Sequence, residues 1–275
     1  MRPLALLAGL ALAACSQAAV PDGERRLPTL VSLNPCSDAI LVEVANPEQI
    51  LALSHYSSDP ASSSMNPDLA RRYSSISGSV EEVLALDPDL VVAGTFLPPA
   101  TATALREIGI PVVTMPIAND VAQSREQVMA LARASGHPER GRSLIEKIDG
   151  ALDKAAPAQN TRPVSAIVWQ GGGIVPGDDT LIADLLRLTG FSSLSATRGF
   201  SQADYLPLEI MLADPPDVIL AAANPRMNEN RQLGHPALRA LEDTRLARLD
   251  PSLLWCGGPT IIHAAQRLKA VRDAM

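Results

Sequence analysis

Two segments of the sequence, 128 residues apart, repeat one pattern. Residues 81–94 read EEVLALDPDLVVAG and residues 209–222 read EIMLADPPDVILAA, with 6 identities in 14 positions and mostly apolar pairs elsewhere. Each copy predicts a short helix, a Pro-Asp turn and a buried strand of aliphatic residues. A repeat at about half of a 275-residue chain indicates two similar α/β lobes. A solenoid would instead repeat about every 20–50 residues.

The rest of the chain alternates short apolar strands with helices, which predicts parallel sheets covered by helices on both faces. The expected fold class is therefore α/β, with two Rossmann-like lobes. Strands are expected at Leu30–Leu33, Ile50–Leu53, Leu90–Ala93, Val112–Met115, Val164–Trp169, Val218–Ala221 and near Leu246–Leu249. Helices are expected at Ala39–Val44, Glu81–Leu86, Ala100–Ile108, Leu181–Leu188, Leu208–Ala213, Pro236–Leu241 and Pro259–Ala274.

The region between the lobes is predicted to contain two helical stretches, Ser124–Ser135 and Pro138–Lys154, and no strand. Residues 138–154 begin with a proline at a position that a helix tolerates, and Ile145, Ile148 and Leu152 form an apolar stripe along one face. A long backbone helix would therefore join the lobes. The expected domains are an N-terminal lobe at 28–118, a helical region at 119–160 and a C-terminal lobe at 161–275.

The N-terminus has the features of an export signal. One positive residue, Arg2, precedes an uncharged run of 11 residues, which is shorter than the roughly 20 needed to cross a bilayer. The run ends in Leu-Ala-Ala-Cys-Ser, which resembles a lipobox. Residues 1–15 are therefore predicted to be a signal peptide cleaved before a lipidated Cys15, and residues 16–27 a tether. A soluble export signal cut after a small-residue site is the alternative.

Composition excludes nucleic acid as a partner. The chain has 23 basic against 30 acidic residues, a net charge of −7, so it lacks the excess of positive charge that phosphate binding requires. It also has only 8 aromatic residues, too few for a platform on which bases stack.

The order of these segments resembles the substrate-binding proteins of ABC importers. The closest resemblance is to the class with a long helix between its lobes, which serves cobalamin, iron–siderophore and haem uptake. It covers roughly residues 28–275. It rests on VSLNPCSD (31–38), SHYS (54–57), the two repeat units and GPTIIHAAQRL (258–268).

The resemblance implies a periplasmic, lipid-anchored monomer that captures a metal chelate between its lobes and delivers it to the permease of an ABC transporter. It also implies that Glu81 and Glu209, which superpose in the repeat, dock on arginines of the permease. Such exposed ion contacts mainly set orientation and association rate. The alternative is that both are first-turn glutamates favoured by the helix dipole.

Ligand contacts are expected in the loops that follow the strands, because ligands of open parallel sheets bind beyond the strands' carboxyl ends. Arg226, and also Arg198, would pair with an acidic group of a ligand. The cargo stays open, because the chain has fewer tryptophans than cobalamin binders of this class and few cleft cations for a siderophore. The expected ligand-binding residues are Asn34, Cys36, Tyr56, Phe96, Trp169, Tyr205, Arg226, Trp255 and Cys256.

Cys36 and Cys256 are expected to face the cleft from opposite lobes. An oxidising compartment favours a disulfide between them, which would cross the cleft entrance and restrict its opening. The alternatives are free thiols in the cleft, able to touch a soft metal or a ligand, or two unrelated locations.

The leading hypothesis is a binding protein without enzymatic activity, cofactor or resident metal. The four histidines show no metal-ligand spacing. One alternative is an exported enzyme with Cys36 as nucleophile and His55 or His263 as base. Another is a protein of the same fold that binds bare metal.

Overall fold

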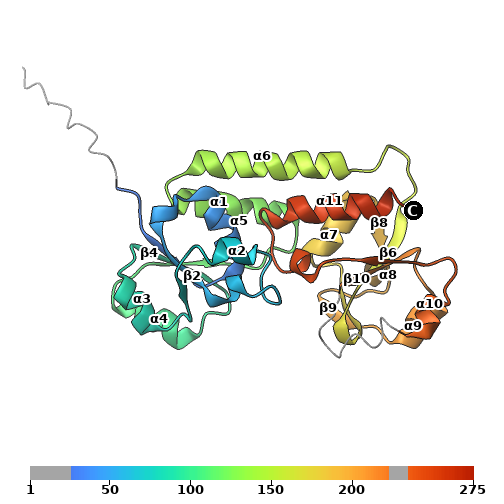
Figure 1. Ribbon diagram of the computed structural model, residues 1–275, viewed down its shortest axis with the longest axis horizontal. Coiled ribbons are helices and arrows are strands. Elements are labelled where there is room, and N and C mark those ends of the chain that lie inside the picture. Colours follow the sequence, from blue (N-terminus) through green and yellow to red (C-terminus); the bar gives the residue numbers. More distant parts are fainter. Residues whose placement is uncertain (1–25, 223–234) are drawn as a thin grey trace, which may run out of the picture.

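The computed structural model describes residues 26–222 and 235–275. Two α/β lobes lie next to each other, and a layer of long helices runs along one side of both (Figure 1). This arrangement confirms the predicted fold class.

The first lobe contains a five-stranded sheet in the order β3-β2-β1-β4-β5, in which all neighbouring strands are parallel. Its strands are β1 (Leu30–Ser32), β2 (Ile50–Ser54), β3 (Ser75–Ile76), β4 (Leu90–Gly94) and β5 (Val112–Met115). Its helices are α1 (Pro35–Val44), η1 (Pro47–Gln49), η2 (His55–Ser58), α2 (Pro67–Ala70), α3 (Val80–Leu86) and α4 (Pro99–Glu107).

The second lobe contains a four-stranded parallel sheet in the order β11-β10-β6-β8 and a separate antiparallel ribbon of β7 and β9. Its strands are β6 (Val164–Gln170), β7 (Ile174–Pro176), β8 (Phe191–Ser193), β9 (Ala203–Tyr205), β10 (Val218–Ala222) and β11 (Arg245–Arg248). Its helices are η3 (Gly171–Gly173), α7 (Leu181–Leu188), α8 (Leu194–Thr197), α9 (Leu208–Ala213), α10 (Pro236–Arg239), η5 (Pro251–Leu254) and α11 (Thr260–Arg272).

The two repeat copies occupy equivalent places in the two sheets. They form α3 with β4 and α9 with β10, and the order β2-β1-β4-β5 in one sheet matches β8-β6-β10-β11 in the other. The repeated aspartate has one role in both. Asp89 Oδ2 accepts a hydrogen bond from Thr29 N at 2.8 Å, and Asp217 Oδ2 accepts one from Ser165 N at 2.7 Å. Each aspartate therefore fixes the start of the neighbouring strand.

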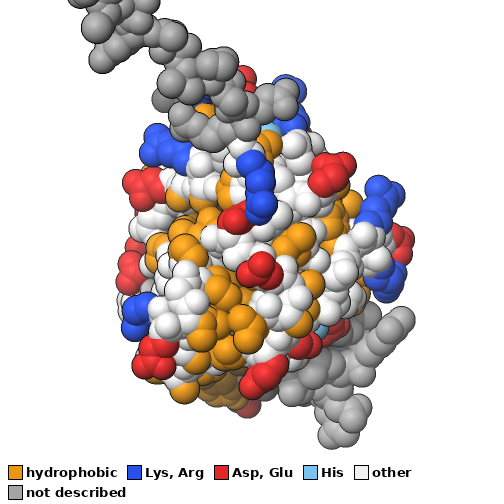
Figure 2. All heavy atoms as spheres, turned by 90° about the vertical axis from the view of Figure 1, so that its left-hand side faces the viewer, with side chains coloured by type: hydrophobic (Ala, Val, Ile, Leu, Met, Phe, Trp, Pro, Cys, Tyr) orange, Lys and Arg blue, Asp and Glu red, His pale blue; other side chains and the backbone are white. Residues whose placement is uncertain are grey.

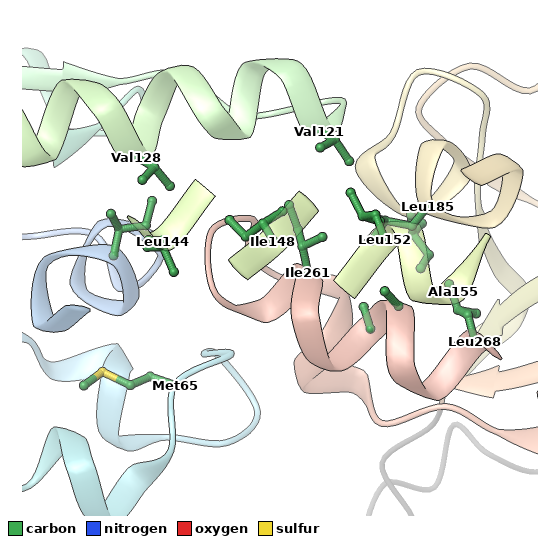
Figure 3. Packing of buried hydrophobic residues seen from close by; sticks show 14 of the residues in the cluster. Met65, Val121, Val128, Leu144, Ile148, Leu152, Ala155, Leu185, Ile261 and Leu268 are labelled. Atoms are coloured by element: carbon green, nitrogen blue, oxygen red, sulfur yellow. The ribbon is translucent and has the colours of Figure 1, made fainter. Parts of the chain in front are cut away.

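Helices α5 (Val121–Ala134) and α6 (Pro138–Ala155) connect the lobes. Leu144, Ile148 and Leu152 of α6 are buried, and they lie between α5 on one side and α11 on the other (Figure 3). The cluster to which they belong extends from Leu30 in the first sheet to Val168 in the second. One continuous apolar core therefore links both lobes through the helical layer.

The structure differs from the sequence prediction in details. Strands β3, β7, β8 and β9 were not expected, because segments of two or three residues carry too little periodicity to be recognised. Two residues assigned to the tether already contact the folded part. Arg26 Nη2 lies 2.8 Å from Asp89 Oδ2, and Leu27 lies against Gly136.

Candidate functional site

A cavity of about 470 Å³ lies between the lobes, at the carboxyl ends of their strands. The first lobe contributes the segments that follow β1, β4 and β5. The second lobe contributes the end of β6, the β7–β9 ribbon, the start of α7 and the segment before α11. The predicted cleft between the lobes is therefore present, and its volume is within the range typical of small-molecule sites.

The described residues that line this cavity include no aspartate, glutamate, lysine, arginine or histidine. Instead, five side-chain amides converge on it from both lobes, among apolar side chains. An anionic group bound here would be transferred from water without a compensating charge from these residues, which is unfavourable. The amides belong to Asn34, Asn119, Gln127, Gln170 and Gln202.

Asn34 combines a structural role with a position in the cavity wall. It is the N-cap of α1, and its Oδ1 accepts hydrogen bonds from Cys36 N at 2.8 Å and Ser37 N at 3.2 Å. Its Nδ2 lies where a Cβ on Gly94 would be, so β4 must end in glycine for the amide to fit. The amide nitrogen makes no hydrogen bond with the described residues and is available to a ligand acceptor.

Gln127 of α5 is buried and reaches the cavity beside the β5–α5 connection. Its Nε2 donates a hydrogen bond to Pro116 O at 2.5 Å, which fixes the side chain. Its Oε1 accepts no hydrogen bond from the described residues, and so the cavity offers both an amide donor and an amide acceptor in fixed positions.

Two of the predicted aromatic residues line the cavity, one from each lobe. Phe96 follows β4 and is 83% exposed, and Trp255 precedes α11 and is 47% exposed. Tyr205 does not line the cavity, whereas Ala203 does. The two residues lie on the same face of the β7–β9 ribbon. Tyr56, also predicted at the site, does not line the cavity; it is exposed on η2 and packs on His55, with ring centroids 4.0 Å apart.

The prediction that Trp169 lines the cleft is wrong. The side chain is fully buried in the second lobe, in a cluster with Val175, Leu206 and Met211. Side chains alternate along β6, so Trp169 faces the same side as Ile167, away from the core that contains Val168. Position at a strand's end did not indicate which face the residue occupies.

Cys36 and Cys256 form a disulfide, with Cα atoms 5.0 Å apart, and both line the cavity. The pairing was one of the alternatives left open by the sequence, and the structure decides it. An enzyme with Cys36 as nucleophile would require a free thiol, which this bond removes. The described residues also contain no group of three or more His, Cys, Asp or Glu side chains arranged to hold a metal ion.

Arg226 and Cys15 fall outside residues 26–222 and 235–275. Arg198 pairs with Asp214, with Nη2 2.9 Å from Oδ2, and does not line the cavity. Glu81 on α3 and Glu209 on α9 are both exposed, and neither makes an ion pair with a described residue.

A buried carboxyl group lies behind the cavity wall. Asp38 of α1 is fully buried, and its Oδ2 accepts hydrogen bonds from Ser54 N at 2.9 Å and Ser57 Oγ at 2.6 Å. Burial raises the pKa of Asp38 to about 7, although the hydrogen bonds from neighbouring serines oppose the shift. Asp38 thereby connects α1, which carries Cys36, with η2, which carries Tyr56.

Several residues of the cavity were not predicted from the sequence. Met115 ends β5 and residues 116–119 follow it, and the rule that identified the other loops would have found them. Gln202 and Ala203 depend on the β7–β9 ribbon, which was not expected. Thr180 to Ile182 begin α7, where the chain leaves the ribbon.

Residues 30–252 match the family model described as periplasmic binding protein. The chain belongs to the periplasmic binding protein family. This membership agrees with the binding protein that the sequence favoured. None of the helices in the described part of this family member is long and apolar enough to cross a membrane.

The chain is similar in sequence to a curated protein. A cobalamin-binding protein of Halobacterium salinarum is 23% identical over 200 residues, which are 71% of this chain and 54% of that protein. The chain thus spans about half the length of this curated relative.

Two solved structures have the same architecture. The haem-binding protein RhuT of Roseiflexus sp. RS-1 is 21% identical, with a TM-score of 0.69 and coverage of 90% of this chain and 98% of that one. The vitamin B12-binding protein BtuF of Vibrio cholerae is 17% identical, with a TM-score of 0.68 and coverage of 90% and 96%.

Proposed function

We propose that this protein captures a corrinoid in the interlobe cleft and delivers it to an ABC transporter permease. The observation that carries this proposal is the uncharged, amide-bearing cavity wall. A corrin ring carries peripheral amide groups, which pair with the asparagine and glutamine side chains of the cleft. Its flat apolar surface suits Phe96 and Trp255, which reach the cavity from opposite lobes.

The other metal chelates of this type fit the cavity less well. Haem carries carboxylates, and ferric siderophores of the catecholate and carboxylate kinds carry negative charge, whereas the described lining offers no cation. Haem iron also needs an axial ligand. Among the described lining residues, the two cysteines are disulfide-bonded, and Met115 is the one remaining side chain of a kind that ligates haem iron. Met115 is nine-tenths buried. The cobalamin-binding relative agrees with this choice.

The proposal is tested by binding measurements with four probes: cyanocobalamin, dicyanocobinamide, haemin and a ferric tris-catecholate. We expect the two corrinoids to raise the melting temperature and to bind with a Kd in the micromolar range or below, with no turnover. Tighter binding of haemin or of the siderophore would overturn the corrinoid assignment, and the variant Met115→Leu would then show whether that residue ligates the iron.

A substitution at Asn34 separates ligand binding from helix capping. Aspartate caps helices about as well as asparagine, so Asn34→Asp keeps α1 intact while it replaces the free amide donor by a carboxylate. We expect the melting temperature to stay within a few degrees and corrinoid affinity to fall about tenfold, which corresponds to about 1.4 kcal/mol. Unchanged affinity would remove Asn34 from the site.

Docking to the permease is assigned to Glu81 and Glu209. In Figure 1, α3 and α9 lie in different lobes, on the side of the molecule away from α6. Exposed apolar side chains accompany both glutamates, with Leu84 on α3 54% exposed and Ile210 on α9 45% exposed. Seen from the end of the first lobe, apolar side chains gather in the lower half, with acidic side chains around them (Figure 2).

We infer that the protein is a periplasmic monomer anchored to a bacterial membrane through a lipid on Cys15. The Leu-Ala-Ala-Cys-Ser sequence supports this anchor. Incorporation of radiolabelled palmitate in the bacterial host tests it, and the expected result is labelling of the native protein and none of Cys15→Ser. Labelling that persists in this variant would contradict the anchor.

A further inference from the structure

The two lobes meet at a contact region beside the cavity, which we call the seam. It consists of residues 34–40 of the first lobe and residues 252–258 of the second. The disulfide between Cys36 and Cys256 crosses it and joins positions 220 residues apart in the chain. Apart from the backbone itself, this bond is the one covalent link between the lobes within the described residues.

The residues that follow Cys256 fit the seam because they are glycines. A Cβ on Gly257 would collide with Ser124 of α5, and one on Gly258 would lie 2.6 Å from Ile40 Cγ1 of α1. Gly258 also has a positive φ of 59°, which glycine adopts without strain. Its N–H donates a hydrogen bond to Ser124 Oγ at 2.7 Å. The segment is therefore held against both α1 and α5.

A second connection lies farther along the seam. Ser64, in the loop after η2, donates a hydrogen bond from its Oγ to Ser252 O of η5. Leu253 and Leu254 of η5 pack against the core that both lobes share, and Met65 is buried in the same core. Residues 252–258 are thus held by a polar contact, an apolar contact and a covalent bond.

The disulfide lies directly beside two residues of the ligand site. Trp255 precedes Cys256, and Asn34 lies two residues before Cys36; all four line the cavity. We propose that the Cys36–Cys256 disulfide is a positioning element that holds Trp255 and Asn34 at a fixed separation, so that the cleft is already formed before the ligand binds. This inference rests on the proposed function for the part that concerns ligand affinity.

The physical advantage is preorganisation. A cleft that must close around its ligand loses conformational freedom on binding, and this cost is subtracted from the affinity. When the disulfide already fixes the seam, this conformational freedom is lost during folding, and binding no longer reduces it. The motion that remains for capture is confined to segments beyond the seam, such as the exposed Phe96 loop.

The experiment compares the native protein with Cys36→Ser/Cys256→Ser by hydrogen exchange and by cyanocobalamin binding kinetics. We expect exchange of the amides in residues 255–262 to increase about tenfold and cyanocobalamin affinity to fall by about the same factor. Slower association accounts for part of this loss of affinity, because without the disulfide the lobes must first reach the separation that binds the ligand.

A control variant distinguishes positioning from general stability. Leu105→Ala removes a fully buried side chain from the apolar cluster on the far side of the first sheet, away from the seam. It lowers the melting temperature, and we expect exchange in residues 255–262 and cyanocobalamin affinity to stay native. If Leu105→Ala weakened binding as much as the double serine variant, the disulfide would be only a stabilising element.

The exchange measurement decides the proposal without any ligand. Native protection of residues 255–262 in the double variant would overturn it, even if cyanocobalamin bound well. Failure of the native protein to bind cyanocobalamin would count against the proposed function and leave the exchange result valid. If the double variant does not fold, the native protein is opened with dithiothreitol, which gives two electrons and two protons to the disulfide and becomes its own cyclic disulfide. The same two readouts then apply.

Discussion

Gly94 has no side chain, and the amide of Asn34 occupies the space where one would begin. We predict that Gly94→Ala displaces this amide and so weakens both its hydrogen bonds to the first turn of α1 and its position in the cavity. Loss of a helix cap costs about 1 kcal/mol. Urea denaturation should show a loss of at least about this size, and corrinoid affinity should fall in the same variant.

Gly150 of α6 provides a matched control. A Cβ there meets no atom within 4 Å, so Gly150→Ala changes only the backbone preference. Alanine in a helix interior is favoured over glycine by about 0.5–1 kcal/mol, and this variant should be more stable than the native protein. If Gly94→Ala were also stabilising, the close approach of Asn34 would not constrain the site.

Asp38 should make stability depend on pH. Its pKa is about 7 when folded, because of burial, and 3.8 in the unfolded reference. Between these values the folded state holds more protons than the unfolded state, so stability falls as the pH rises from about 4 to about 7. In the variant Asp38→Asn the side chain cannot titrate, and its amide oxygen can still accept hydrogen bonds from Ser54 and Ser57.

Denaturation of Asp38→Asn between pH 4 and pH 8 measures this effect. We expect the free energy of unfolding of the native protein to fall between pH 4 and pH 7, and that of the variant to stay constant over this range. The stability of the variant relative to the native protein should therefore be higher at pH 8 than at pH 4. An identical slope in both proteins would mean that other groups cause the pH dependence.

At the scale of elements, we expect helix α6 to make the two lobes unfold as one cooperative unit. Ile148 is fully buried between α5 and α11, in the core that extends into both lobes (Figure 3). We predict that Ile148→Ala costs about 2–5 kcal/mol, the range for deletion of a buried aliphatic side chain. Because the core is continuous, hydrogen exchange of the backbone amides of β1 and of β6 should accelerate by the same factor.

The exposed Lys147 is the control for α6, since Lys147→Ala changes the neighbouring position without touching the core. Its effect should stay within about 0.5 kcal/mol. Destabilisation of one lobe alone by Ile148→Ala would show that the lobes unfold separately.

The elements that the sequence predicted best are those whose own residues determine them. Pro138 and the Ile148–Leu152 spacing locate α6, and the aliphatic run at Leu90 locates β4. The β7–β9 ribbon could not be found in this way, because its two strands of three residues are defined by pairing with each other.

Within the site, the same difference separates correct from incorrect predictions. The loop rule correctly placed Asn34, Phe96 and Trp255 at the cavity, because parallel strands end at one edge. It failed for Trp169, which is still within β6 and whose direction follows from alternation. The sequence could not decide between a Cys36–Cys256 disulfide and its alternatives, because the distance between the two cysteines depends on how the two lobes pack.

At the scale of the whole molecule, the described residues keep their charged side chains out of the cleft wall. The chain has a net charge of −7, yet the described lining of the cavity carries no charged side chain. In the proposed function, the exposed acidic groups serve docking on the permease, while the cleft discriminates between ligands by shape and by amide hydrogen bonds. The two proposed activities, ligand capture and docking, should accordingly respond to different substitutions.

Neutralisation of the docking glutamates tests this separation. We predict that Glu81→Gln/Glu209→Gln keeps the native affinity for cyanocobalamin, because both residues are exposed on α3 and α9 and neither lines the cavity. Association with the permease in lipid nanodiscs should slow roughly tenfold, and its dependence on salt should weaken, because charge pairs steer encounter. Each single variant should show an intermediate effect, since the repeat places one glutamate on each lobe.

Glu146→Gln is the control, because it removes an exposed charge from α6, on the opposite side of the molecule (Figure 1). If Glu146→Gln slowed association as much as the pair, net charge alone would govern the encounter, and the symmetry of Glu81 and Glu209 would have no part in docking.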